Sequence, residues 1–344
     1  MKIYRKLTAI LLVLMLILSL AACGSKEEEE PQDTSEPASP DIILITDTAG
    51  LGGGGLNDSC WAGLEMAKEE YGLEIYCMET GAEESYISKI EEACNMQPQL
   101  IICAGADMAS GLKTVAAEKP DMKFAIINAE GLGDNVMGIT FSEQDAAFLA
   151  GIAAGMTTQS KIVSFIGAKE SAEQLKYQYA FAAGVATVAT DIYVNTQYLG
   201  SYTDTEAAKT ITNAHIALGS DVIFQATGKC GQTVVEACAS KGVWCIGCGV
   251  DQSEYAPEWV LCSVVRRADN VLFDAITKFH DGAFDGTDIK YTLAGAGVEL
   301  SDNAGNLTDE VKAAVEQYSQ LLSDGQIAAP TDWQTYADYL ATLQ

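Results

Sequence analysis

Short runs of apolar, often β-branched residues alternate with longer stretches of helical spacing from residue 41 onward. An apolar run of about four to eight residues is typical of a strand that is buried on both faces, as in parallel sheets. The pattern predicts strands at residues 41–47, 73–78, 100–104, 123–128, 136–141, 161–167, 192–199, 222–226 and 243–247. It predicts helices from about residue 57 and at residues 83–95, 107–118, 171–189, 204–218 and 231–240.

This alternation occurs twice in tandem, which predicts an α/β fold of two doubly wound, Rossmann-like lobes. We expect an N-terminal lobe over residues 41–142 and a C-terminal lobe over residues 143–267. A helix at 269–281 and a strand around 291–300 then cross back between the lobes. Residues 268–290 would thus complete the first lobe, and residues 291–344, with terminal helices from about 307, the second. Open α/β sheets bind ligands at the carboxyl ends of their strands, and the site is therefore expected in the cleft there.

The first 22 residues have the organisation of a secretory signal peptide. Basic residues precede an apolar run, which ends in Leu-Ala-Ala followed by Cys23. That ending resembles a bacterial lipobox, in which the cysteine is lipidated and becomes the first residue of the mature protein. Residues 23–40 are acidic, rich in Pro and Ser, and lack large apolar residues, which predicts a disordered spacer. We expect a lipid-anchored protein on the extracytoplasmic face of the cell membrane.

The formal net charge of -28 at pH 7 excludes one large class of partner. Binding to nucleic acid depends on neutralising phosphates with Lys and Arg, so this acidic chain is expected to bind none. The lipid anchor, rather than basic residues, would make the membrane contact.

The chain has ten cysteines, and Cys23 leaves nine others. Several of these lie inside apolar, strand-like runs, where a free thiol behaves as a small buried hydrophobe. Free thiols are the favoured interpretation. Cys245 and Cys248 have the C-x-x-C spacing of metal and redox sites, but no second pair of that spacing exists. No metal and no cofactor are therefore expected.

Polar residues follow several of the apolar strands, where ligands of α/β sheets bind. These candidates are Asp47, Asn57, Asp107, Tyr202, Gly228, Asp251 and Arg266. Asp47, Asp107 and Asp204 have an alternative interpretation as helix N-caps. The glycines of residues 50–55 lack the lysine of a phosphate-binding loop and have no basic residue nearby, which favours close backbone approach to a neutral ligand. We find no catalytic constellation, and the chain is not expected to be an enzyme.

From residue 41 to about 300, the chain resembles the basic membrane protein family of solute-binding lipoproteins, which includes purine nucleoside receptors of ABC importers. The resemblance rests on many short stretches in the same order, including Ile45-Thr-Asp47, Asn57-x-x-x-Trp61-x-Gly-Leu64, Phe148-Leu-Ala-Gly-Ile-Ala-Ala154, Phe165-Ile-Gly167, Phe181-Ala-Ala-Gly184, Tyr198-x-Gly-Ser-Tyr-x-Asp204, Ser220-Asp-Val-Ile-Phe224, Val243-Trp-x-Ile-Gly247, Asp251-Gln252 and Ser263-Val-Val-Arg-Arg-x-Asp269. It implies two hinged lobes of the type I periplasmic binding protein kind.

The resemblance also implies roles for individual residues. An aspartate at the Asp47 position contacts the base, and aromatic residues at the positions of Leu56 and Tyr202 sandwich it. Leu56 is not aromatic, so the second face is missing unless Trp61 or Tyr177 substitutes. In the family, an aspartate after the strand at residues 243–247 and a lysine hold the ribose. The family usually has aspartates at the positions of Gly249 and Asp251 and the lysine at the position of Arg266, and this chain departs from the pattern at Gly249 and Arg266.

The sequence thus predicts the binding protein of an ABC importer, with permease and ATPase subunits as partners and a purine nucleoside as ligand. A sugar is the alternative ligand. An extracellular sensor of the same fold is an alternative function, and a lipid-anchored enzyme or redox protein that uses Cys245 and Cys248 is a third.

Overall fold

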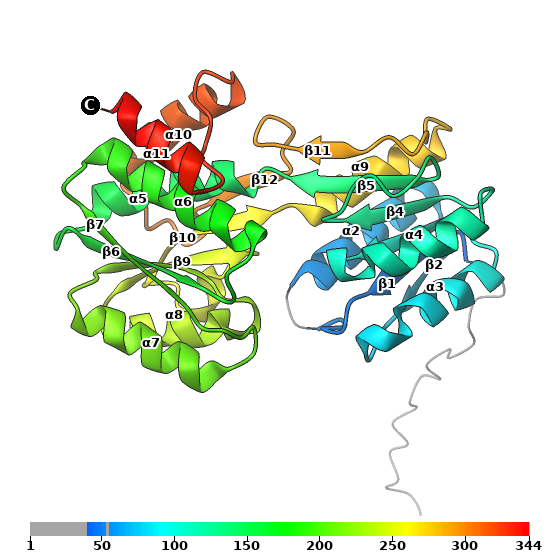
Figure 1. The fold of residues 1–344 in the computed structure, drawn as a ribbon, viewed down its shortest axis with the longest axis horizontal. Coiled ribbons are helices and arrows are strands. Elements are labelled where there is room, and N and C mark those ends of the chain that lie inside the picture. Colours follow the sequence, from blue (N-terminus) through cyan, green and yellow to red (C-terminus); the bar gives the residue numbers. More distant parts are fainter. Residues whose placement is uncertain (1–39, 53–54, 344) are drawn as a thin grey trace, which may run out of the picture. The chain divides into compact units, whose positions relative to one another are not determined.

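The computed structural model describes residues 40–52 and 55–343, and Figure 1 shows their arrangement. The expected signal peptide, the lipidation site at Cys23 and nearly all of the spacer lie outside these residues. In the described part, two six-stranded sheets each carry helices on both faces. The predicted fold class, two doubly wound α/β lobes, is confirmed.

The N-terminal sheet has five parallel strands from the first half of the chain and one from its end. Their order across the sheet is β11 (Ile289–Tyr291), β5 (Val136–Phe141), β4 (Phe124–Ile127), β3 (Leu100–Ala104), β1 (Ile42–Thr46) and β2 (Ile75–Met78). Alternate residues of β1 enter different cores: Ile42 and Leu44 face one, and Ile43 and Ile45 the other. The uninterrupted apolar run is explained by this burial on both faces.

Two pairs of helices cover this sheet. On the side of Ile42 lie α2 (Leu56–Tyr71) and α9 (Ala268–His280), and on the opposite side lie α3 (Tyr86–Asn95) and α4 (Ala109–Glu118). Short 3₁₀ turns, η1 (Glu83–Ser85) and η2 (Ala106–Met108), precede α3 and α4.

The C-terminal sheet is parallel except for its last strand, which pairs antiparallel with its neighbour. The order is β12 (Val298–Ser301), β10 (Val260–Arg266), β9 (Trp244–Gly249), β8 (Val222–Ala226), β6 (Ile162–Gly167) and β7 (Tyr193–Tyr198). One face packs on α5 (Glu143–Thr157) and α6 (Ala172–Val188), and the other on α7 (Thr205–Ala217) and α8 (Gly231–Ala239). The 3₁₀ turns η3 (Gly228–Cys230) and η4 (Ser253–Tyr255) follow β8 and β9.

The terminal helices α10 (Asp309–Ser323) and α11 (Trp333–Thr342) pack on the outer side of α5 and α6. Phe148 of α5 contacts a tyrosine of each, with ring centroids 6.0 Å from Tyr318 and 5.8 Å from Tyr339. The prediction of helices over 307–344 is confirmed.

The chain passes between the two lobes three times. These crossings connect β5 to α5, β10 to α9, and β11 to β12. Backbone hydrogen bonds tie them together: Ser142 donates to the Tyr291 carbonyl over 2.9 Å, and Arg267 donates to the Gly297 carbonyl over 2.9 Å. The three crossings therefore form one connected hinge.

The prediction of a single strand around residues 291–300 is wrong. The segment contains the end of β11 and most of β12, which belong to different sheets and are separated by a turn. Ala296 in this turn has a φ of 52°, and Gly297 packs tightly on Tyr291. An extended run across the hinge is thus broken where the chain changes sheets.

The nine cysteines of the described residues are all free thiols. Seven are buried and two are half-buried, as expected of free thiols that pack as small hydrophobes in strands and on the buried faces of helices. Within residues 40–52 and 55–343, no helix combines the length and apolar character needed to cross a membrane.

Candidate ligand-binding site

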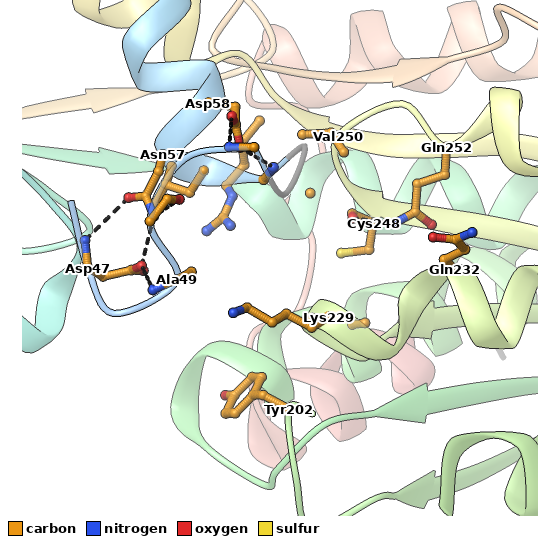
Figure 2. Close-up of a pocket in the computed structure, with 18 of the residues that line it drawn as sticks. Asp47, Ala49, Asn57, Asp58, Tyr202, Lys229, Gln232, Cys248, Val250 and Gln252 are labelled. Carbon is orange, nitrogen blue, oxygen red and sulfur yellow. Dashed lines mark hydrogen bonds between the residues drawn. The ribbon is translucent and has the colours of Figure 1, made fainter. Parts of the chain in front are cut away.

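A cavity of about 500 Å³ lies at the carboxyl ends of strands from both sheets (Figure 2). The N-terminal lobe contributes the segment between β1 and α2 and the first turn of α2, and the C-terminal lobe contributes residues at or after β6, β7, β8, β9 and β10. The lining residues are Asp47, Ala49, Gly50, Leu51, Gly52, Gly55, Leu56, Asn57, Asp58, Glu173, Gln174, Tyr177, Tyr202, Ala226, Gly228, Lys229, Gln232, Cys248, Gly249, Val250, Gln252, Tyr255 and Arg266. Its size falls within the range of about 300–1,000 Å³ that is typical of small-molecule sites.

Asp47 and Asn57 form a fixed pair at the N-terminal side of the pocket (Figure 2). Asn57 donates to Asp47 Oδ1 over 2.8 Å and to the Gly50 carbonyl over 2.9 Å, and the Ala49 amide donates to the same Oδ1 over 2.8 Å. Asp47 Oδ2 accepts no hydrogen bond from the described residues. The pair therefore holds one carboxylate oxygen in place and leaves the other available as an acceptor.

Tyr202 is one of two exposed tyrosines that line the pocket, the other being Tyr255, and 39% of the surface of each is accessible. Gly228 lies against the Tyr202 ring, because a Cβ at this position would be 3.0 Å from Tyr202 Cδ1, and the φ of 62° at Gly228 also favours glycine. Burial raises the pKa of Tyr202, and the nearby Glu173 carboxylate contributes to the same direction. The phenol therefore stays neutral and its ring face is accessible.

Arg266 lies at the end of β10, and its side chain is 16% exposed. Its Nη1 is 3.2 Å from Glu173 Oε1 and 3.6 Å from Glu143 Oε1. Its Nε, in contrast, is buried and has no hydrogen-bond partner among the described residues. A buried donor without an acceptor is costly in free energy. An acceptor on a bound ligand would therefore remove this cost at Arg266, which lines the pocket.

Burial and ion pairing shift the pKa values of Arg266 and of the buried Glu143 beside it. Burial raises the pKa of Glu143, against the opposing effect of Arg266. Burial alone would lower the pKa of Arg266, but Tyr177 and the two carboxylates outweigh it and raise that pKa. Arg266 remains a cation, and Glu143, which is 4% exposed, has a pKa raised above that of an ordinary carboxyl group.

Tyr177 and Cys248 form an uncharged part of the wall. Tyr177 is 3% exposed and packs edge-on against Phe224, with ring centroids 6.2 Å apart. Burial raises the pKa of Cys248 to about 12, although a hydrogen bond from Tyr177 opposes this. Tyr177 presents little ring surface to the pocket and does not replace the missing aromatic face opposite Tyr202.

Buried glutamine side chains at the C-terminal side of the pocket fix the turns after β8 and β9. Gln225 donates to Gln252 over 2.6 Å and accepts from the Thr227 backbone and hydroxyl. The backbone N–H of Gln252 donates to Ser263 Oγ over 3.1 Å. These bonds position the backbone that carries Gly228 and Gly249.

Eight of the eleven residues predicted for the ligand site line this one pocket. They are Asp47, Leu56, Asn57, Tyr177, Tyr202, Gly228, Gly249 and Arg266. Gly249 contributes backbone only, and its φ of 90° would strain any other residue, including the aspartate common in the family.

Three predicted residues lie outside the pocket lining. Trp61 is half-buried on α2 and donates to Glu65, one helical turn further along, over 3.0 Å. Asp107 is exposed in η2. Asp251 accepts from the Ser253 backbone and from Asn303, and so it orders the loop after β9. The N-cap interpretation holds for Asp204, which accepts from the Ala207 amide.

Sequence reasoning missed several lining residues, among them Lys229, Glu173, Gln174 and Asp58. The sequence shows no basic residue near the glycines after β1, and a neutral ligand was expected for that reason. The structure contradicts the premise. Lys229 and Arg266 line the same pocket as Gly50 and Gly52 although they are far away in the sequence. Lys229 lies in the glycine-containing turn that follows β8, and this position after a strand is the sequence signal that could have identified it as a site residue.

Cys245 and Cys248 do not form a paired site. Residues three apart on a strand point to opposite faces, and Cys245 packs in the core under α8 whereas Cys248 lines the pocket. Among the described residues, no cluster of three or more Cys, His, Asp and Glu side chains is arranged to hold a metal ion.

Comparison with known proteins agrees with this geometry. Residues 42–331 match the Bmp family, described as ABC transporter substrate-binding protein PnrA-like. The chain is 29% identical to a CD4+ T-cell-stimulating antigen of Listeria innocua serovar 6a, over 95% of this chain and 99% of that protein. It is also 29% identical to the ABC transporter nucleoside-binding protein BmpA of Lactococcus lactis subsp. cremoris, over 92% and 96%.

Solved structures share the fold. An ABC transporter solute-binding protein from Aeropyrum pernix K1 superimposes with a TM-score of 0.75 at 23% identity, covering 88% of this chain and 97% of that one. The arabinose-binding protein AraP from Geobacillus stearothermophilus superimposes with a TM-score of 0.64 at 13% identity, covering 78% and 99%. Because the family match extends over both lobes and the pocket, the chain belongs to the Bmp family of PnrA-like ABC transporter substrate-binding proteins.

Proposed function

We propose that this chain captures a purine nucleoside in the pocket between its lobes and delivers it to the permease and ATPase subunits of an ABC importer. The observation that carries the proposal is the buried Nε of Arg266, which has no acceptor in the described protein. A ribose hydroxyl or ring oxygen would provide that acceptor. The pocket would then hold the ligand without any chemical step.

The rest of the pocket suits a base. Tyr202 offers an exposed ring face for stacking. Asp47, held by Asn57, offers a free carboxylate oxygen to base N–H groups. The relative from Lactococcus lactis subsp. cremoris is named a nucleoside-binding protein, which supports the same ligand class.

A sugar is the second candidate, and Leu56 favours it. Leu56 lines the pocket where the family resemblance implies an aromatic residue, so the second face of the implied sandwich with Tyr202 is not aromatic. Stacking on Tyr202 without an aromatic partner at Leu56 suits a pyranose as well as a base. Proteins that share the fold include an arabinose-binding protein.

We further propose that the lobes close around the ligand as two bodies, residues 41–142 with about 268–290, and 143–267 with about 291–344. The three crossings would act as the hinge, and such closure is the usual response of two-lobed binding proteins. Residues 1–22 would direct export, Cys23 would carry the lipid anchor, and residues 23–40 would link the anchor to the lobes.

A thermal-shift screen of the purified protein tests the ligand class. Inosine, guanosine and adenosine are compared with hypoxanthine, uridine, arabinose and glucose. We expect purine nucleosides to raise the melting temperature most, because ligand binding to the folded state stabilises it. A shift with arabinose or glucose and none with any nucleoside would replace the nucleoside by a sugar.

Arg266→Gln and Arg267→Gln provide a matched pair for the same screen. Arg267 is adjacent in sequence, pairs with Asp269 and Glu299, and does not line the pocket. We expect Arg266→Gln to abolish most of the nucleoside shift and Arg267→Gln to retain it. Equal shifts in the two variants would remove Arg266 from the binding site.

A further inference from the structure

We infer that Lys229 makes this pocket selective for 6-oxopurine nucleosides, such as inosine and guanosine, over 6-aminopurine nucleosides such as adenosine. The inference rests on the proposed nucleoside function and deepens it. Lys229 lines the pocket, and no feature of the family resemblance described above includes it.

The backbone fixes where Lys229 begins. It is the middle residue of η3, directly after Gly228, whose backbone lies against the Tyr202 ring. Figure 2 shows the Lys229 side chain on the same side of the pocket as Tyr202, with its ammonium end directed toward the turn that carries Asp47 and Ala49. A base stacked on Tyr202 would therefore have this ammonium at its edge.

The ammonium of Lys229 has no competing partner. It forms no ion pair with any described residue, in contrast to Arg266, which pairs with Glu143 and Glu173. A second lysine, Lys169, lies 5.6 Å from the centre of the Tyr202 ring but does not line the pocket. Of these two cations near Tyr202, Lys229 is the one that a ligand in the pocket would meet.

Asp47 and Lys229 together present an acceptor and a donor to the ligand. A 6-oxopurine has an N1–H donor beside its O6 acceptor, so the free Asp47 oxygen can accept from N1–H while Lys229 donates to O6. Adenine has an acceptor at N1 and an amino donor at position 6, and that amino group would face the ammonium. Lysine donors to O6 and N7 are a common means of recognising guanine.

Isothermal titration calorimetry on the purified protein measures the preference. We expect inosine and guanosine to bind at least about fivefold more tightly than adenosine, since one well-placed contact of this kind discriminates by about 1–3 kcal/mol. Lys229→Met should reduce the ratio of inosine to adenosine affinity to within about twofold of unity, through weaker inosine binding.

Lys169→Met is the matched control, because it removes the same charge beside the same tyrosine from outside the pocket. We expect it to retain the wild-type ratio. Lys229→Gln, which keeps a neutral donor, should give an intermediate ratio. Melting temperatures of the unliganded variants verify folding, and Lys229 is exposed, so a change there should be tolerated.

Two outcomes overturn the inference while the nucleoside function stands: equal binding of inosine and adenosine by the wild type, or an unchanged ratio in Lys229→Met. If no nucleoside binds the wild type at all, the proposed function fails, and this inference fails with it.

Discussion

Arg266 combines a buried charge, a hinge position and an unfilled hydrogen bond. It is the last residue of β10, directly before the crossing to α9, and Glu143 follows the crossing from β5. The ion pair between Arg266 and Glu143 joins two crossings of the hinge. Arg266 also lines the pocket, and its Nε has no acceptor among the described residues. A ligand that supplies an acceptor to Nε would thus interact with the hinge directly.

Tyr202→Ala should weaken binding of a purine nucleoside by about fivefold to a hundredfold, because base–aromatic stacking contributes about 1–3 kcal/mol. Leu56→Phe should tighten binding by adding the second stacking face. Calorimetry with inosine measures both. Tyr193→Ala, at an exposed tyrosine outside the pocket, is the control. A Tyr202→Ala variant with unchanged inosine affinity would contradict the stacked geometry.

Asp145 predicts a pH dependence of stability. Burial raises its pKa from the ordinary value of 3.8 to about 6. The native state therefore binds this proton more tightly than the unfolded state. Protonation of Asp145 stabilises the native state at low pH, and this stabilisation is lost as pH rises through about 4 to 6. The free energy of unfolding of Asp145→Asn should rise relative to that of the wild type by about 1 kcal/mol between pH 4 and pH 8. This value is smaller than the full pKa shift would give, because the half-buried group is partly screened by solvent.

Urea unfolding at the two pH values measures this change. Asp121→Asn makes the same chemical change at an exposed site and should show no such gain. A difference between Asp145→Asn and the wild type that is the same at pH 4 and pH 8 would contradict the raised pKa.

Individual site residues were predictable where they directly follow a strand. Asp47, Tyr202, Gly228 and Arg266 were found in this way, and all line the pocket. Asp251 occupies the same kind of position, but its carboxylate orders its own loop. Lys229 was missed because its relation to Asp47 exists only in the folded chain. Side-chain direction and pairing across lobes depend on tertiary structure.

At the scale of elements, strands were predicted well and two segments poorly. α5 has no amphipathic pattern, since twelve of its fifteen residues are buried between the sheet and other helices. A helix that is buried on all sides lacks the periodicity from which helices are predicted. The 291–300 segment was mistaken for one strand because the change from one sheet to the other at Gly297 has no hydrophobic signature.

The crossing of α5 and α6 depends on two glycines. A Cβ on Gly184 would lie 2.0 Å from the Phe148 carbonyl oxygen, and one on Gly151 would lie 2.2 Å from the Phe181 carbonyl oxygen. Gly184→Ala should therefore destabilise the protein by about 1–3 kcal/mol or more, because the helices must separate. Urea unfolding measures the change.

Gly81→Ala is the control, since no atom lies within 4 Å of its Cβ position. We expect it to change the free energy of unfolding by less than about 0.5 kcal/mol. If Gly184→Ala is as stable as Gly81→Ala, the close packing of α5 on α6 is incorrect.

At the scale of the whole molecule, the tandem α/β pattern was sufficient to predict two lobes, because each of the two arrays of alternating strands and helices forms its own sheet. The sequence also predicts how the protein is held at the membrane, through Cys23, which lies outside the described residues. Cys23→Ala should move the protein from the membrane fraction to the soluble fraction, because the acidic spacer offers no other anchor.

Detergent phase partitioning measures that shift, with Cys77→Ala as a control at a cysteine within the folded part. The control should remain with the detergent phase. If Cys23→Ala partitions with detergent as the wild type does, the anchor lies elsewhere.

The central claim is that a purine nucleoside binds in this pocket with Arg266 and Tyr202 as partners. A crystal structure of the protein grown with saturating inosine tests it most directly. The account predicts inosine with its base on the Tyr202 ring and beside Asp47, and its ribose accepting a hydrogen bond from Arg266 Nε. Inosine absent from this pocket, or bound there without contact to Arg266 Nε, would contradict the account.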